Sequence, residues 1–203
     1  RQVRLLPITT RSIAQYQRIR WPAGALPREA LTANGAVLLR DGAIDRDWYD
    51  QSWELVRAHQ GALRDLLGRI SAREDVTSAR IVENMYVYAA CSDAAAAERC
   101  AATWAQDAPF QMEVSGRKVY WFPPGIDKGT ALRRAAGRYR PERILCAGDS
   151  VIDVPMLRRA DLAMIPDGTL LPAPPAERTL VCQENVRFPD FVLRTVLAQA
   201  GPG

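Results

Sequence analysis

Two aspartates in the last third of the sequence have a spacing suited to metal chemistry. An apolar run over residues 144–148 leads into Asp149, and Asp153 follows four residues later. Ligands of open α/β sheets bind beyond the carboxyl ends of the strands. Asp149 is therefore placed where a carboxylate can hold a hard cation such as Mg²⁺. The alternative is that Asp149 begins a turn and Asp153 caps a helix.

A lysine and a pair of threonines are candidates for phosphate binding. Lys128 opens a predicted helix, where a cation gains nothing from the helix dipole, in a chain with only two lysines. Its position indicates either a task at a phosphate or a solvated surface lysine. Thr9 and Thr10, followed by Arg11, come directly after the first predicted strand. A hydroxyl there can donate to a phosphate oxygen or serve as a helix N-cap.

Composition and charge limit the class of protein. Of the 203 residues, 48% are apolar and 25% charged, values typical of a globular protein. No apolar run is long enough to predict a membrane-spanning helix. The net charge of +4 is spread along the chain, so we expect no nucleic-acid partner and no membrane partner. The four cysteines form no Cys-x-x-Cys pair, which makes a zinc site unexpected and a cytoplasmic location the simplest expectation.

The elements that must position these residues change in character along the chain. Apolar strands followed by helices near both ends are typical of a parallel sheet, whereas hairpins and helices fill the middle. We therefore predict an α/β fold interrupted by an α+β insert, with a loop over residues 21–34. The predicted strands are 3–8, 36–39, 43–44, 80–90, 110–114, 118–122, 143–147, 162–165 and 179–182, and the predicted helices are 12–19, 47–70, 93–105, 127–138, 154–159 and 190–200.

One predicted strand of the insert, residues 80–90, carries several large polar side chains. Glu83, Tyr86 and Tyr88 could face a ligand, or they could pack on the predicted helix over residues 47–70. We expect the packing arrangement, because aromatic residues near an amphipathic helix are usually part of a core.

In their order along the chain, these motifs resemble those of the haloacid dehalogenase (HAD) superfamily of phosphohydrolases. The narrower resemblance is to its Cof-type, sucrose-phosphatase-like branch with a C2 cap. It implies a Rossmann-like core with a parallel sheet over residues 1–35 and 120–203, and an inserted α+β cap over residues 36–119. The matching segments are Thr9-Thr10-Arg11, Asn34-Gly35-Ala36, Asp127-Lys128-Gly129, and Gly148-Asp149-Ser150 with Asp153 and Met156.

The resemblance implies a Mg²⁺-dependent phosphatase of small, sugar-phosphate-like metabolites that acts through an aspartyl-phosphate intermediate. Thr9 would hydrogen-bond the transferring phosphoryl group, and Lys128 would neutralise the nucleophile and the phosphate. Asp149 would bind Mg²⁺, and Asp153 would bind it directly or through water. The oligomeric state is not predicted. Weaker candidates for substrate binding, from their positions alone, are Thr10, Arg11, Asn34 and Ser150.

Two departures from the family pattern affect this interpretation. Ile152 stands where many relatives have Asn, so the outer shell of the metal or the substrate range is expected to differ. The Asp-x-Asp-x-Thr motif that carries the nucleophile occurs nowhere in the sequence. In the family it lies on a central strand, between those corresponding to residues 3–8 and 143–147. We therefore expect an upstream segment that supplies this strand, without which the chain would be inactive.

The missing motif leaves two other functions open. A non-catalytic relative would keep the fold as a binding or regulatory protein. A mutase-like enzyme would transfer the phosphoryl group to an acceptor other than water.

Overall fold

The structure is a computed structural model, and it describes residues 3–104, 109–167 and 179–200. The chain divides into two compact units. We call residues 1–5 and 128–203 the Lys128 unit, and residues 6–127 the Thr9 unit. This division does not test the predicted core and cap boundaries at residues 35 and 119, which stay predictions. Within the described ranges, no helix has both the length and the apolar character that crossing a membrane requires.

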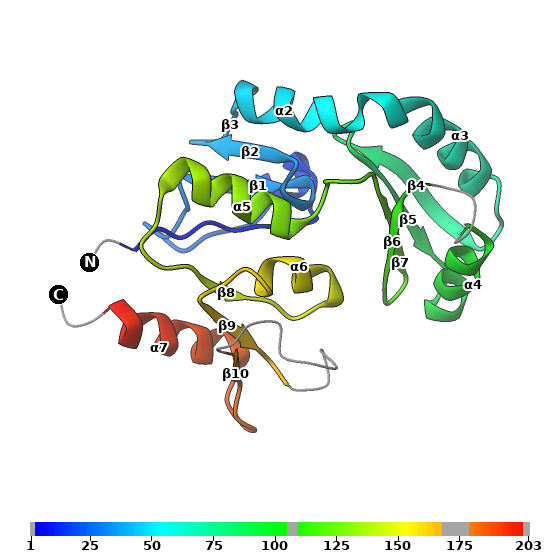
Figure 1. The fold of residues 1–203 in the computed structure, drawn as a ribbon. Coiled ribbons are helices and arrows are strands. Elements are labelled where there is room, and N and C mark those ends of the chain that lie inside the picture. The colour runs from blue at the N-terminus through cyan, green and yellow to red at the C-terminus, as the bar shows by residue number, and fades with distance from the viewer. Residues whose placement is uncertain (1–2, 105–108, 168–178, 201–203) are drawn as a thin grey trace. The chain divides into compact units, whose positions relative to one another are not determined.

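The Lys128 unit contains a three-stranded parallel sheet in the order β10–β9–β8 (Figure 1). All four residues of the central strand, β9, are buried, as expected for a strand of a parallel sheet covered on both faces. The predicted parallel sheet is therefore confirmed. The elements of this unit are α5 (Lys128–Tyr139), β8 (Leu145–Ala147), η3 (Val151–Asp153), α6 (Val154–Leu157), β9 (Leu162–Ile165), β10 (Thr179–Val181) and α7 (Phe188–Ala200).

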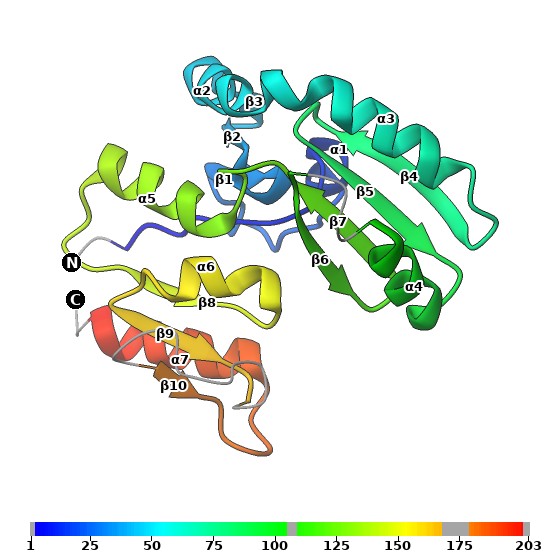
Figure 2. The ribbon, with the colours of Figure 1, turned by 45° about the vertical axis from the view of Figure 1, so that its right-hand side comes forward.

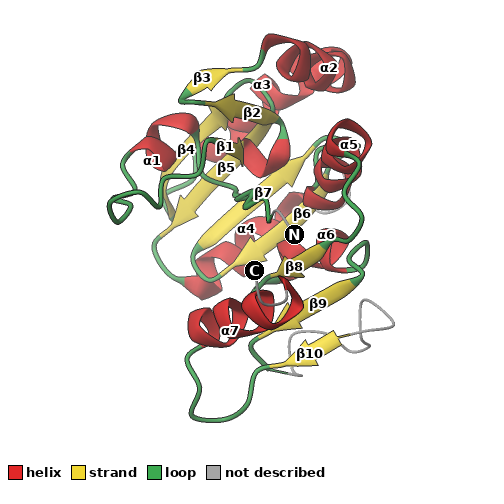
Figure 3. Ribbon diagram, turned by 90° about the vertical axis from the view of Figure 1, so that its left-hand side faces the viewer, coloured by secondary structure: helices red, strands yellow, loops and turns green. Residues whose placement is uncertain are grey.

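The Thr9 unit contains two antiparallel sheets, β1–β2–β3 and β4–β5–β7–β6. Figure 2 shows α3 and α4 together on one face of the four-stranded sheet, and Figure 3 shows its strands side by side. The elements of this unit are α1 (Ile13–Gln17), β1 (Glu29–Thr32), η1 (Ala33–Gly35), β2 (Val37–Arg40), β3 (Ala43–Ile44), α2 (Arg46–Val56), η2 (Arg57–His59), α3 (Gln60–Ser71), β4 (Val76–Val82), β5 (Tyr86–Cys91), α4 (Ala94–Trp104), β6 (Gln111–Ser115) and β7 (Lys118–Phe122).

The predicted helix over residues 47–70 is two helices, α2 and α3, separated by the 3₁₀ turn η2. At the end of α2, Val56 has a φ of −109°, outside the helical range. α2 buries Trp48 and lies on β2, whereas α3 buries Leu63 and Leu66 against the four-stranded sheet. A single straight helix carries one apolar stripe and cannot cover two sheets, so the chain bends between them.

The predicted strand over residues 80–90 is the hairpin β4–β5. Its turn residues Glu83 and Asn84 have φ values of 49° and 64°. Positive φ at both central positions characterises the tight hairpin turns that match the twist of the strands. Asn is common in such turns, whereas Glu is not. Because of this glutamate, the sequence pattern did not predict the turn.

Alternation along β5 separates its side chains onto two faces. Val87 and Ala89 join the core formed with α3 and α4. Tyr86 and Tyr88 lie on the opposite face, where the Tyr86 ring is 4.8 Å from the ring of Phe122. The prediction that these tyrosines pack on the helix over residues 47–70 is therefore wrong for α3, which covers the other side of the sheet. Glu83, the third residue of that prediction, does contact this segment, because its carbonyl accepts from the Tyr49 hydroxyl of α2 at 3.3 Å.

The predicted strand 3–8 pairs only at its end. Ile8 forms a parallel bridge to Leu31 of β1, in which Leu31 N donates to the Pro7 carbonyl at 2.8 Å and Thr9 N donates to the Leu31 carbonyl at 2.9 Å. β1 itself lies in the segment predicted as loop, residues 21–34. Its Glu-Ala-Leu-Thr sequence has little strand propensity, so its pairing with β2 rather than local preference makes it a strand.

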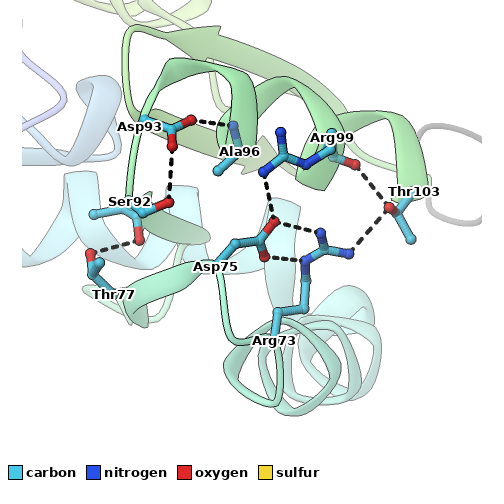
Figure 4. Close-up of polar contacts among 9 residues, drawn as sticks. Arg73, Asp75, Thr77, Ser92, Asp93, Ala96, Arg99 and Thr103 are labelled. Atoms are coloured by element: carbon cyan, nitrogen blue, oxygen red, sulfur yellow. Dashed lines mark hydrogen bonds and ion pairs between the residues drawn. The ribbon is translucent and has the colours of Figure 1, made fainter.

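A polar network links the start of β4 to α4 (Figure 4). Two guanidinium nitrogens of Arg73 donate to the two Asp75 carboxylate oxygens, each at 2.9 Å. Arg99 approaches the same carboxylate to 3.7 Å. The hydrogen bonds from Arg73 hold the pKa of Asp75 below its ordinary value. The network contains none of the candidate site residues, so we assign it a structural role, which is to hold the start of β4 to α4.

The core of the four-stranded sheet gives the first testable prediction. Leu66 is fully buried in it, whereas Leu26 is 65% exposed in the same unit. We expect Leu66→Ala to lower the free energy of unfolding by about 2–5 kcal/mol, because it removes buried methyl groups and leaves a cavity. Leu26→Ala, the matched control, should change it by less than about 0.5 kcal/mol. Urea unfolding of both variants measures the difference, and equal losses would contradict the assigned core.

Candidate functional site

The candidate site of the Lys128 unit is built around a buried ion pair. Lys128 Nζ lies 2.5 Å from Asp153 Oδ1, and the two residues are 8% and 4% exposed. Burial costs both ions their hydration, so neither is stable there without the other. An ammonium group has three N–H donors. Lys128 therefore keeps donors beyond the one that Asp153 receives.

The second carboxylate oxygen of Asp153 holds the loop that leaves β8. Asp153 Oδ2 accepts from the backbone N–H groups of Asp149 and Ser150, both at 3.1 Å, and from Ser150 Oγ at 3.0 Å. Both oxygens of Asp153 are thus engaged, one by a cation and one by the loop. The Ser150 hydroxyl gives its proton to Asp153, so only its lone pairs remain for the predicted contact with substrate.

Two glycines permit this arrangement. A Cβ on Gly148 would stand 2.5 Å from Asp153 Cβ, and a Cβ on Gly129 would stand 2.3 Å from the carbonyl oxygen of Pro155. Both distances are far inside van der Waals contact. A side chain at Gly148 would displace Asp153, and one at Gly129 would separate α5 from α6. The sequence reasoning missed both roles, although each glycine adjoins a motif residue.

Asp149 is the carboxylate of this site that fits a metal ion. It is exposed and follows the carboxyl end of β8. Mg²⁺ is usually bound through one or two carboxylates together with phosphate oxygens and water. Asp153, whose oxygens are both engaged, fits an outer position better than direct ligation. No group of three His, Cys, Asp or Glu suited to a metal occurs in the described ranges.

The apolar residues behind the loop contribute no polar group to it. Ile152 is 7% exposed and Cys146 is 6% exposed. Burial, reinforced by the charges of Asp153 and Asp161, raises the pKa of the Cys146 thiol to about 12. The thiol therefore stays protonated and is no nucleophile.

The Thr9 unit holds the other predicted motif, which we call the threonine loop, residues 9–11. The Thr9 carbonyl accepts from Asn34 N at 2.8 Å, and Thr9 Oγ1 accepts from Arg11 N at 3.2 Å. A hydroxyl oxygen that accepts from Arg11 still has its own proton to donate. Thr9 can therefore give a hydrogen bond to a phosphate oxygen, and the exposed Arg11 side chain adds a positive charge to the same loop.

Thr10 and Asn34 contact protein atoms. The Tyr86 hydroxyl donates to the Thr10 carbonyl at 2.6 Å. Asn34 is 1% exposed, adopts a φ of 57°, and donates from Nδ2 to the Ile126 carbonyl at 3.3 Å. It therefore links the two chain segments that flank the predicted insert. Substrate binding by Thr10 and Asn34 stays a prediction that these contacts do not support.

The predicted site residues form two groups in the structure. One group lies in the Lys128 unit and consists of Lys128, Asp149, Ser150 and Asp153. The other group lies in the Thr9 unit and consists of the threonine loop and Asn34. The sequence marked Tyr86 as a side chain that could face a ligand, but it gave no signal for the contact with Thr10, which joins residues far apart along the chain.

Comparison with known proteins relates the chain to solved structures. The sequence matches no protein-family model and no curated protein. The sucrose-phosphatase of Synechocystis sp. PCC6803, solved with sucrose and phosphate, matches 89% of this chain and 78% of its own, with a TM-score of 0.63 and 19% identity. The trehalose-6-phosphate phosphatase C-terminal domain of C. albicans matches 98% of this chain and 79% of its own, with a TM-score of 0.59 and 16% identity.

A third solved structure carries the name of the predicted superfamily. A haloacid dehalogenase-like hydrolase from B. subtilis matches 88% of this chain and 83% of its own, with a TM-score of 0.51 and 16% identity. At such identities the likeness concerns the fold. The chain has the α/β fold of haloacid dehalogenase-like hydrolases, and the fold prediction is confirmed.

The buried ion pair gives the second prediction. Asp153→Asn leaves the Lys128 charge buried without a counter-ion, so we expect the free energy of unfolding to fall by about 3–5 kcal/mol. The control is Asp190→Asn in the exposed pair with Arg187, where we expect less than about 1 kcal/mol. Adding Lys128→Met to Asp153→Asn should restore part of the loss in urea unfolding. If Asp153→Asn and Asp190→Asn lowered the free energy of unfolding equally, the assigned burial of the Lys128–Asp153 pair would be contradicted.

Proposed function

We propose that this chain, which has the fold of haloacid dehalogenase-like hydrolases, is the larger part of a Mg²⁺-dependent phosphatase. The observation that carries the proposal is the buried pair of Lys128 and Asp153 beside the exposed Asp149, at the carboxyl end of β8. Replacing a buried ion pair by apolar residues is often neutral or stabilising. Packing alone therefore does not require this pair, which supports a functional task for Lys128, such as the binding of an anion.

The similar structures support the substrate class. One is a sucrose-phosphatase solved with sucrose and phosphate, and another is a trehalose-6-phosphate phosphatase domain. Both names describe phosphatases related to sugars. We therefore propose a small phosphorylated metabolite resembling a sugar phosphate as the substrate, and hydrolysis of its phosphate monoester as the reaction, in the cytoplasm.

We propose one role for each site residue. The Thr9 hydroxyl donates to an oxygen of the transferring phosphoryl group, and the spare N–H donors of Lys128 offset its negative charge. Asp153 orients Lys128, and Asp149 would hold Mg²⁺. When bound, Mg²⁺ supplies further positive charge at the phosphoryl group.

The attacking group belongs, in this proposal, to an aspartate on a strand outside the printed sequence. Among the described residues β8 pairs only with β9, so one edge of β8 is free to receive such a strand. The aspartate oxygen forms a bond to phosphorus while the ester P–O bond breaks. A second carboxyl group gives its proton to the leaving alcohol and then helps water to hydrolyse the aspartyl phosphate.

A non-catalytic phosphate-binding protein is the second candidate function. The absence of an Asp-x-Asp-x-Thr motif from the printed sequence and the apolar Ile152 favour it. It differs from the phosphatase in a measurable way, because it binds phosphate esters without turnover.

The third prediction tests the phosphatase with the full-length natural protein. We expect Mg²⁺-dependent hydrolysis of p-nitrophenyl phosphate that is lost when the metal is removed with EDTA. Lys128→Ala and Asp149→Asn should each lower kcat/KM by about 100-fold or more, because each removes charge stabilisation of the transition state. Glu142→Gln, an exposed acid of the same unit, should stay within about twofold of wild type.

Two results would overturn parts of this proposal. Full activity of both Lys128→Ala and Asp149→Asn would refute the assigned site. Phosphate binding by the wild type without turnover, measured by calorimetry, would favour the non-catalytic candidate.

A further inference from the structure

The hairpin β4–β5 contacts the threonine loop from the sheet face opposite the core that the sheet forms with α3 and α4. We propose that Tyr86 is a positioning residue, which acts through Thr10 to aim the hydroxyl of Thr9. The proposal rests on the proposed function, in which the Thr9 hydroxyl meets a phosphoryl group.

A single rigid peptide unit transmits the effect of Tyr86. Its hydroxyl donates to the Thr10 carbonyl at 2.6 Å, and Arg11 N donates to Thr9 Oγ1 at 3.2 Å. The Thr10 carbonyl and the Arg11 N–H belong to the same planar peptide bond. Fixing the direction of the carbonyl therefore fixes the direction of the N–H. Rotation of this peptide would withdraw the donor from Thr9 Oγ1 and free the hydroxyl to turn.

Tyr86 is well suited to hold this peptide. It is fully buried, and its ring packs on Phe122 with a centroid distance of 4.8 Å. Burial raises the pKa of its hydroxyl above the ordinary value, so the hydroxyl keeps its proton at neutral pH and can donate it.

A second buried tyrosine lies beside Tyr86 on the neighbouring strand. Tyr120, on β7, is 6% exposed, and its ring centroid is 6.3 Å from that of Tyr86. Burial raises the pKa of Tyr120. The Tyr86 ring is therefore packed between aromatic residues of β7, which keeps its hydroxyl directed at the Thr10 carbonyl.

Glu83, in the turn of the hairpin, fixes the chain just beyond the threonine loop. Its Oε1 accepts from Ile13 N at 3.0 Å, and its carbonyl accepts from the Tyr49 hydroxyl at 3.3 Å. Glu83 has a φ of 49°, a conformation that a non-glycine residue adopts at a cost. These contacts offset that cost, and the strained turn thus anchors the residues that follow the loop.

The backbone of Thr9 has hydrogen-bond partners of its own. An effect of Tyr86 on the Thr9 hydroxyl can therefore be distinguished from a general loss of packing. Thr9 N donates to the Leu31 carbonyl at 2.9 Å, and the Thr9 carbonyl accepts from Asn34 N at 2.8 Å. These bonds do not involve Tyr86. Loss of the Tyr86 hydroxyl should therefore leave Thr9 in place and disturb only the peptide between Thr10 and Arg11.

The test compares two tyrosine-to-phenylalanine variants of the full-length natural protein. Tyr86→Phe removes only the hydroxyl that holds Thr10. We expect kcat for p-nitrophenyl phosphate to fall about tenfold with KM nearly unchanged, and amide exchange over residues 9–13 to rise about fivefold. Tyr88→Phe is the control. It lies on the same strand and face and contacts Tyr120 and Arg80, and both measurements should stay within about twofold of wild type.

A double-mutant cycle tests whether Tyr86 acts through Thr9. Once Thr9→Ala has removed the hydroxyl, adding Tyr86→Phe should lower kcat by less than about twofold, because the two residues affect the same hydrogen bond. Multiplicative losses in the double variant would overturn the proposal.

Amide exchange distinguishes failure of this proposal from failure of the proposed function. Unchanged exchange over residues 9–13 in Tyr86→Phe, or a rise spread evenly over the four-stranded sheet, would overturn the positioning role. If the wild type shows no turnover but Tyr86→Phe loosens residues 9–13 alone, the phosphatase proposal fails while the contact of Tyr86 with the loop is supported.

Discussion

The ion pair between Lys128 and Asp153 is the constraint on which the Lys128 unit depends. A buried ammonium group needs a buried carboxylate beside it, and that carboxylate in turn orders the loop after β8 through its second oxygen. The close approach then excludes side chains at Gly129 and Gly148. One electrostatic requirement therefore determines the start of α5, the turn after β8 and the contact of α5 with α6.

In the Thr9 unit, hydrogen bonds have the role that the ion pair has in the Lys128 unit. The groups proposed to meet a phosphate, the Thr9 hydroxyl and the Lys128 ammonium, are each held by a buried residue that does not meet it. In the Lys128 unit, Asp153 contacts the Lys128 ammonium. In the Thr9 unit, Tyr86 holds the Thr10 carbonyl, next to Thr9. Holding donors in place before the ligand arrives reduces the reorganisation that the reaction requires. In the proposed function, the buried partners therefore matter as much as the groups that they hold.

Prediction from sequence succeeded where local pattern and final environment agree. The apolar run of β9 has the predicted bounds, Leu162–Ile165, because a strand buried on both faces is apolar throughout. It failed where distant contacts decide the conformation. β1 is a strand because it pairs with β2, and the bend at Val56 exists because α2 and α3 cover different sheets. Neither cause is visible in a short window of sequence.

The sequence by itself determined the motifs, their order and the fold class, because residue types and their spacing along strands and helices carry that information. It placed Asp149 after a strand and Lys128 at the start of a helix. Only the tertiary structure decided that Asp153 neutralises Lys128 and that Tyr86 holds Thr10. Each of these contacts joins side chains or backbone atoms many residues apart, and their geometry exists only once the helices and sheets have packed.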